Sequence, residues 1–371
     1  MWQAEARIDL NAVRANVARL RAATNAGVMA VVKADGYGHG AVACARAALA
    51  AGATWLGVRS LSEALELRAA GLTAPVLAWL IGPGAPVREA VAADVDLSAS
   101  SRPHLAEIVA AARSANRVAR IHLKIDTGLN RNGAPPAEWP ALAEAAAKAE
   151  AGGEVEVVGV WSHLACADEV GHPSIDRQLD VYREALDVAE RAGISPAVRH
   201  LANSAATLTR PDTHFDLVRP GIAVYGLTPI AGRDFGLRPA MTVRAPVVLA
   251  KRVPAGEGVS YGHTYVTARE TTLSLIPLGY ADGVSRSASG VAPVWVAGAR
   301  HPIAGRVCMD QFVVDVGDDA VALGDEAILF GPGDAGEPTA DDWAAATGTI
   351  NYEIVTRFGR SGLARTYAGQ A

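Results

Sequence analysis

Cysteine is scarce in this chain, and the few cysteines that occur lie far apart. The 371 residues include three, Cys44, Cys166 and Cys308, with no CxxC pair among them. An odd count at such spacing predicts neither a disulfide framework nor a zinc site, and it favours a reducing compartment. The nine histidines form no HExxH or similar ligand pair either, so we expect no metal cofactor.

The sequence also lacks an excess of positive charge and any long apolar run. A formal net charge of -5 gives no basic surface for nucleic acid or an anionic membrane. The first residues show no charged segment followed by an apolar one, as a signal peptide would, and no apolar stretch approaches the length that spans a membrane. We therefore expect a cytoplasmic protein that binds neither nucleic acid nor membranes.

Strand-like and helix-like segments alternate from Val28 to about Gly226. Eight runs rich in strand-forming residues alternate with alanine-rich segments that begin near Ser, Asp or Pro and end on Gly or Asn, as helices do. This alternation is typical of a parallel (β/α)8 barrel of the TIM type. The eight runs are VMAVVKA, WLGVRS, PVLAWL, DVDLSAS, RIHLKIDT, EVEVVGVWSHL, AVRHLANS and DLVRPGIAVYGL.

After about Gly236 the residue pattern changes to valine-rich runs interrupted by Gly and Pro. Short strands at close spacing, with turn residues between them, predict a mainly antiparallel β domain with one late helix at ADDWAAATG. The length of 371 residues suits one large domain and one smaller domain. We expect a barrel domain over residues 1–236 and a β domain over residues 237–371, and the strand expected within residues 1–10 could pair with either.

Polar side chains recur where the predicted barrel strands end. Barrel enzymes carry their chemistry on the loops that follow the strands, so these positions share one rim. Taken singly, a histidine at a strand end is more often structural than catalytic, and a lysine or arginine there is often an ion-pair partner. Five of the eight predicted strands deliver such a group, which favours a functional site. The residues are Lys33, Lys124, Arg131, His163, His200, Ser204 and Arg219.

Lys33 ends the first predicted barrel strand and precedes a glycine-rich segment, DGYGHG. A lysine desolvated on a rigid strand shifts toward its neutral amine and becomes a nucleophile for carbonyl compounds. Tyr37 and its neighbouring glycines offer a hydroxyl donor and close backbone approach to a ligand. Ser204 and the amides of Gly221 and Ile222 lie where barrels form phosphate sites. A carbonyl-reactive lysine opposite a phosphate site indicates pyridoxal 5'-phosphate (PLP).

Nine segments spread along the chain resemble those of bacterial alanine racemase, a PLP enzyme with an N-terminal barrel and a C-terminal β domain. They occur in the same order and at compatible spacing over nearly the whole chain, which makes the resemblance specific. The segments are AVVKADGYGHG, KIDTGLNRNG, SHLACADE, HLANSAA, RPGIAVYGL, GVSYGHTY, PLGYADG, GRVCMDQ and NYEIVTR.

The resemblance implies an isomerase that interconverts L-alanine and D-alanine through a PLP external aldimine and supplies D-alanine for peptidoglycan in the cell wall. Lys33 would carry the cofactor and act as one base. Tyr261 of the partner subunit would act as the other in a homodimer with shared active sites, and Tyr265 is the nearest competitor for that role. Arg131 and the Met309 amide would meet the substrate carboxylate.

The resemblance also implies the surroundings of the cofactor. Arg219 would donate to the pyridine nitrogen and disfavour its protonation, because two cationic centres repel each other in a low-dielectric pocket. His163 would lie near the pyridine ring, and Lys124 is a candidate for carbamylation beside Arg131. The implied cofactor-binding residues are Lys33, Tyr37, His163, Asn203, Ser204, Arg219, Gly221, Ile222 and Tyr352.

Other interpretations stay open at this point. A racemase of broader specificity fits the same motifs, since pocket volume cannot be read from the sequence. A decarboxylase of the same architecture pairs an acidic residue with the pyridine nitrogen, where this chain offers Arg219. A non-catalytic PLP carrier has no use for a second base, and a protein with purely structural lysines and histidines would bind no cofactor. Trp161 and the C-terminal RFGRSGLARTYAGQA depart from the family pattern. The first bears on packing around the cofactor ring, and the second on the docking of the tail.

Overall fold

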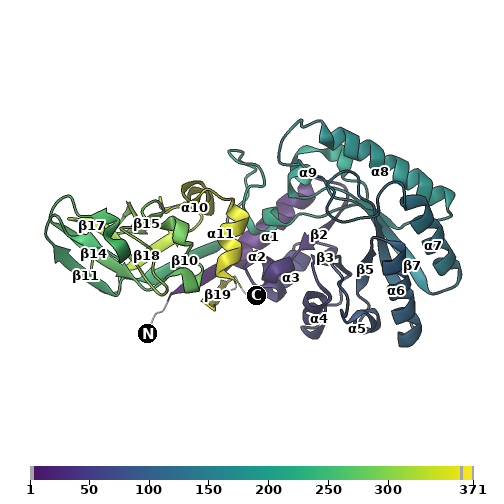
Figure 1. The fold of residues 1–371 in the computed structure, drawn as a ribbon, viewed down its shortest axis with the longest axis horizontal. Helices are drawn as coiled ribbons and strands as arrows, with labels where there is room; N and C mark the ends of the chain where they lie inside the picture. Colours follow the sequence, from purple (N-terminus) through teal and green to yellow (C-terminus); the bar gives the residue numbers. More distant parts are fainter. Residues whose placement is uncertain (1–3, 360–361, 370–371) are drawn as a thin grey trace.

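The computed structural model describes residues 4–359 and 362–369 and shows an elongated molecule with two parts (Figure 1). A barrel of strands and helices forms one end, and a β-rich part forms the other. Helix α1 (Leu10–Ala22) lies between them. Within the described ranges, no helix is both long enough and apolar enough to cross a membrane.

The predicted barrel is confirmed. Its strands are β2 (Gly27–Val31), β3 (Trp55–Val58), β4 (Val76–Ala78), β5 (Asp96–Ala99), β6 (Ala119–Lys124), β7 (Val155–Trp161), β8 (Val198–His200) and β9 (Leu217–Val218). They pair in parallel in the order β8-β7-β6-β5-β4-β3-β2-β9. The two ends of this order meet through backbone hydrogen bonds from Asp216 to Arg199 and from Arg219 to Ala202. Each predicted run overlaps one of these strands, and β2 and β6 begin one residue before their runs.

Helices connect the strands and form the outer layer of the barrel (Figure 1). They are α3 (Ala41–Ala50), α4 (Leu61–Ala69), α5 (Val87–Ala92), α6 (Arg102–Ala115), α7 (Trp139–Ala151), α8 (Ser174–Arg191) and α9 (Ser204–Thr209). Helix α6 shows why they form. Ser101 caps its first turn, and Leu105, Ile108 and Ala112, three and four residues apart, are buried against the barrel.

The β-rich part is built mainly from antiparallel strands, as predicted. One sheet contains β10 (Met241–Pro246), β15 (Pro293–Val296), β16 (Ala299–Pro302), β18 (Glu326–Phe330), β19 (Ala364–Ala368) and, from the start of the chain, β1 (Glu5–Asp9). Its order is β16-β15-β18-β10-β1-β19. Strand β1 pairs antiparallel with β10 and parallel with β19. The first strand of the chain therefore belongs to the sheet of the β-rich part.

Further strands and two helices complete this part. The other strands are β11 (Leu249–Val253), β12 (Gly258–Val259), β13 (Tyr265–Val266), β14 (Thr271–Ile276) and β17 (Phe312–Gly317). The expectation of a single late helix is wrong, because α10 (Ala340–Thr347) is followed by α11 (Asn351–Phe358). Gly348 ends α10 in a left-handed conformation. Helix α11 then buries Ile354, Val355 and Phe358 on one face.

The segment after β2 forms a tight left-handed turn, α2 (Lys33–Tyr37). Four consecutive residues, Ala34 to Tyr37, have φ angles of 52°, 53°, 63° and 52°. Only one of the four is a glycine, and a side chain in this conformation costs about 1–2 kcal/mol. Neighbouring contacts must therefore hold the turn in place.

Three carboxylate contacts provide that support. Glu63 Oε1 accepts a hydrogen bond of 2.9 Å from the Ala34 amide. Asp35 Oδ1 accepts one of 2.8 Å from the Ala41 amide, and the other oxygen of Asp35 pairs with Arg365 of β19. The last strand of the chain thus helps to fix the turn that begins at Lys33.

Candidate active site

A cavity of about 810 Å³ opens among the loops that follow the barrel strands. Its size suits a cofactor together with a small substrate. Its wall contains predicted residues from the barrel and, from α11, Tyr352. These residues are Lys33, Tyr37, Lys124, Arg131, His163, Asn203, Ser204, Arg219, Gly221, Ile222 and Tyr352. Tyr261 and Met309 do not line it.

Lys33 projects into the cavity from the left-handed turn. Its Nζ lies 5.7 Å from the ring centroid of Tyr37 and 5.9 Å from that of Trp79. Burial lowers the pKa of Lys33, and the positive charge of Arg131 lowers it further. A lowered pKa increases the share of neutral amine, which is the nucleophilic and basic form.

A wall of hydroxyl groups faces the same cavity. Ser204 Oγ accepts hydrogen bonds from the amides of Gly221 at 2.8 Å and Ala223 at 3.4 Å. The rings of Tyr37 and Tyr352 have centroids 6.2 Å apart. A Cβ atom on Gly221 would lie 2.3 Å from the Tyr37 hydroxyl, so only glycine permits this close approach. Hydroxyl and amide groups gathered in this way suit a phosphate group.

Arg219 follows β9 directly and is buried in the cavity wall. Its Nη2 donates to the carbonyls of Ser162 at 2.7 Å and Leu201 at 3.1 Å. It also contacts His163 Nδ1 at 3.3 Å, and its Nη1 contacts His200 Nδ1 at 3.1 Å. Burial lowers the pKa of Arg219 to about 10, so the guanidinium remains protonated at neutral pH. His200 Nδ1 must then accept from Nη1, whereas His163 Nδ1 can only share one of the two Nη2 hydrogens with a carbonyl.

Lys124 and Arg219 share one aromatic neighbour. Lys124 Nζ lies 4.2 Å from the Trp161 ring centroid, and the Arg219 guanidinium carbon lies 4.8 Å from it. Burial lowers the pKa of Lys124 to about 7, and the charges of Arg219 and Arg131 act in the same direction. Its amine is therefore about half neutral near neutral pH. Trp161 therefore lies within cation–π range of both groups, and such contacts are favourable.

Tyr261 and Met309 lie in the β-rich part, away from the cavity of their own chain. Tyr261 is 70% exposed and Met309 is 54% exposed. Tyr265 differs, since its hydroxyl donates to Asp315 Oδ2 at 2.6 Å. Burial and this contact raise the pKa of Tyr265 to about 12.

The sequence analysis missed several residues of the cavity wall. Arg59 follows β3, Trp79 follows β4, and Ser100 follows β5. The rule that barrel chemistry lies after the strands could have identified Arg59 and Ser100. Lys33 and His163, expected at strand ends, lie two residues beyond β2 and β7, where the chain is free to turn into the cavity.

Comparison with known proteins shows the family. Residues 8–229 match the alanine racemase N-terminal domain and residues 240–367 match the alanine racemase C-terminal domain. The alanine racemase of Salinispora arenicola is 65% identical over 370 residues, which cover 100% of both chains. That of Thermobifida fusca is 62% identical over 368 residues, which cover 99% of this chain and 98% of the relative. The crystal structure of alanine racemase from D-cycloserine-producing Streptomyces lavendulae has a TM-score of 0.98 and 58% identity, and the match covers 100% of this chain and 98% of that one. The chain therefore belongs to the alanine racemase family.

Proposed function

We propose that this chain interconverts L-alanine and D-alanine with PLP bound in the barrel cavity. The observation that carries the proposal is a single cavity that holds a desolvated amine, Lys33, with a hydroxyl-lined wall and a buried guanidinium, Arg219. A phosphorylated aromatic aldehyde matches these three features together. Family membership supports alanine as the substrate.

Different residues of the cavity wall would bind different parts of PLP. The hydroxyls of Tyr37, Ser204 and Tyr352, with the backbone of Gly221 and Ile222, would bind its phosphate. When bound, PLP withdraws electrons from the amino acid attached to it and makes the Cα–H acidic.

Other residues would hold the ring end of the cofactor. Lys33 would hold the aldehyde carbon covalently, and Arg219 would donate to the pyridine nitrogen. His163 and Asn203 would flank the ring, and His163 would stay neutral, because burial and then the Arg219 charge place its pKa well below its ordinary value. A buried arginine at the pyridine nitrogen speaks against the decarboxylase alternative, which places an acid there.

Racemisation requires a proton donor and acceptor on each face of the Cα atom. The Lys33 amine would take or return the proton on one face. The hydroxyl of Tyr261 of the partner subunit would do so on the other. The exposure of Tyr261, and its absence from the cavity wall of its own chain, support this assignment. The active unit would be a homodimer in which the β-rich part of each chain completes the cavity of the other.

Substrate orientation would depend on Arg131, whose planar guanidinium binds a carboxylate through two parallel hydrogen bonds. The amide of Met309 of the partner subunit would meet the same carboxylate. Lys124 would buttress Arg131 as a carbamate. Its half-neutral amine can attack carbon dioxide, forming an N–C bond with loss of one proton, and the product is an anion beside Arg131 and Arg219.

The test is a chiral assay of the purified protein with PLP against a panel of L-amino acids. We expect D-alanine to form from L-alanine faster than any other product, and a broader profile would support the broader-specificity alternative. Lys33→Ala should reduce racemisation to background even with added PLP, and normal activity of this variant would overturn the proposal. Supply of D-alanine to peptidoglycan and a cytoplasmic location remain predictions.

A further inference from the structure

A line of buried polar side chains runs through the barrel interior to Arg219. Asp96 of β5, His122 of β6 and His200 of β8 are each completely buried. His122 Nε2 lies 3.2 Å from Asp96 Oδ2, and His122 Nδ1 lies 2.8 Å from His200 Nε2. His200 Nδ1 lies 3.1 Å from Arg219 Nη1. Apolar side chains ordinarily fill the interior of such a barrel, so a continuous polar line indicates a specific role.

Neighbouring residues stack on this line of polar side chains and leave space for it. The ring of Trp161 stacks on that of His200, with centroids 5.6 Å apart and planes within 6°. A Cβ atom on residue 159 would lie 2.3 Å from His122 Nδ1. Glycine at this position of β7 therefore leaves the space in which His122 meets His200. Trp161 Nε1 donates to Ser98 Oγ at 3.0 Å, which fixes the stacked ring.

The two ends of the line determine the direction of every hydrogen bond in it. Arg219 can only donate, and the Asp96 carboxylate can only accept. His200 must therefore accept at Nδ1 and donate from Nε2 to His122. His122 must likewise accept at Nδ1 and donate from Nε2 to Asp96. Both rings are neutral with the proton on Nε2. Burial, followed by the Arg219 charge, lowers the pKa of His200 well below its ordinary value, which agrees with a neutral ring.

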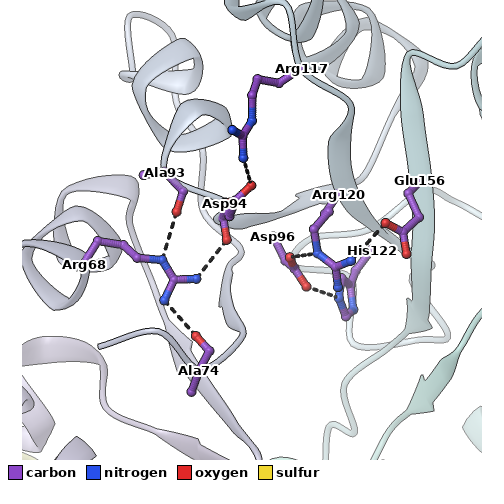
Figure 2. Close-up of polar contacts among 9 residues, drawn as sticks. All are labelled: Arg68, Ala74, Ala93, Asp94, Asp96, Arg117, Arg120, His122 and Glu156. Atoms are coloured by element: carbon purple, nitrogen blue, oxygen red, sulfur yellow. Dashed lines mark hydrogen bonds and ion pairs between the residues drawn. The ribbon is translucent and has the colours of Figure 1, made fainter. Parts of the chain in front are cut away.

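The far end of the line is Asp96, the first residue of β5, which Arg120 also contacts (Figure 2). Arg120 Nε donates to Asp96 Oδ1 at 2.8 Å, and Arg120 Nη1 donates to Glu156 Oε2 at 2.9 Å. Burial alone would raise the pKa of Asp96, but the hydrogen bonds from His122 and Arg120 outweigh it and lower the pKa. Asp96 therefore remains an anion and a pure acceptor.

We propose that Asp96 and His122 are positioning residues that act on Arg219 through His200. The inference rests on the proposed function, in which Arg219 donates to the pyridine nitrogen of PLP. The line gives Nη1 of Arg219 a fixed acceptor, His200 Nδ1, and the carboxylate that sets the direction of the hydrogen bonds does not line the cavity. Arg219 can then stay protonated beneath the cofactor without an acidic neighbour that would compete for its donors.

The ring tautomers test the proposal directly in the full-length protein without cofactor. The chain is labelled with 15N-histidine, and the ring signals of His122 and His200 are assigned from His122→Gln and His200→Gln variants. Long-range 1H–15N spectra at neutral pH should show protonated Nε2 and unprotonated Nδ1 in both rings. A proton on Nδ1 of either ring, or on both nitrogens, would overturn the proposal. This measurement needs no variant of Asp96 and no activity.

Asp96→Asn tests whether the effect reaches Arg219. The single amide oxygen would accept from Arg120, so the amide NH2 group would face His122. His122 would then carry its proton on Nδ1, and His200 would turn an N–H toward Arg219, which also donates. We expect both ring signals to change tautomer, and kcat for alanine to fall about tenfold or more with a smaller change in KM.

Asp94→Asn is the matched control. Asp94 lies two residues away at the same end of the barrel and pairs with Arg117 instead (Figure 2). Its φ of 53° is one that asparagine readily adopts. This variant should leave kcat and both tautomers unchanged. If Asp96→Asn behaved as Asp94→Asn does in a racemising enzyme, the positioning role alone would fail, whereas absence of racemisation in the unsubstituted chain would refute the proposed function.

Discussion

Tyr265 donates its hydroxyl to Asp315 at 2.6 Å, whereas Tyr261, four residues earlier, is 70% exposed. Asp315 also accepts a hydrogen bond from Thr271. Tyr265 is thus tied to its own chain, with a pKa raised to about 12 by burial and Asp315. Of the two, Tyr261 is therefore the tyrosine that we propose to act in the cavity of a second chain.

Tyr261→Phe and Tyr265→Phe should therefore differ in their effects on kcat. Tyr261→Phe removes one of the two proton-transfer groups, so it should lower kcat for alanine in both directions by about 100-fold or more. Tyr265→Phe removes a hydrogen bond to a carboxylate, so it should lower the free energy of unfolding by about 1–2 kcal/mol while kcat stays within about threefold. Steady-state assays and thermal unfolding of both variants check this. If Tyr265→Phe lowered kcat more than Tyr261→Phe does, Tyr265 would be the second base.

Arg131→Lys keeps the positive charge but loses the planar fork that binds a carboxylate. We expect kcat/KM for alanine to fall about tenfold or more, while the net charge and the fold are unchanged. Kinetics with far-UV circular dichroism as the folding control test this. If Arg131→Lys had the kinetics of the wild type, Arg131 would be a structural ion-pair residue and would not bind the substrate carboxylate.

The pKa of Lys124, lowered to about 7, gives carbamylation a defined pH dependence. Only the neutral amine reacts with carbon dioxide, and the neutral share grows as pH rises through about 7. The carbamate signal of protein in 13C-bicarbonate should therefore increase between about pH 6 and pH 8, and activity should rise with it. Lys124→Met, which cannot be carbamylated, serves as the control. A 13C signal that persists in this variant would have to come from another amine.

The shared site can be tested by mixing inactive chains. Lys33→Ala and Tyr261→Phe homodimers should each be nearly inactive, because every site lacks one base. A hybrid of the two contains one site with both bases intact. Purified hybrids should recover about half of the wild-type turnover per dimer if the sites act independently. Hybrids as inactive as their parents would place both bases on one chain.

The sequence predicted the barrel because alternating strand and helix periods are local signals, and all eight strands followed them. It did not predict α11, because this short helix starts only three residues after Gly348, within a region where short strands dominate. The left-handed turn that begins at Lys33 could not be predicted from the sequence either. Its left-handed residues include Ala34 and Tyr37, whose preferences oppose that conformation, and the contacts from Glu63 and Arg365 that hold it are distant in the sequence.

The candidate cavity residues could be predicted from strand ends, since parallel strands bring those ends to one rim. Asp96 and His122 could not. Each lies within its strand, where alternation assigns a side chain to the core, and a core histidine in a sequence is most simply a packed one. Their partnership with His200 exists only once β5, β6 and β8 have closed into a barrel. The short distances that reveal it, and the lack of space for a side chain at Gly159, are seen only in three dimensions.

The position of β1 has a consequence for synthesis of the chain on the ribosome. Strand β1 pairs with Arg244 and its neighbours on one side and with Ala364–Ala368 on the other, all of which are synthesised after it. At about 5–20 residues per second, its nearer partner follows only after about 10–50 s. During that interval both edges of β1 are unpaired, and unpaired strand edges are sites of aggregation. Strand β19 follows β10 later still, so the second edge of β1 stays unpaired after β10 has paired with the first.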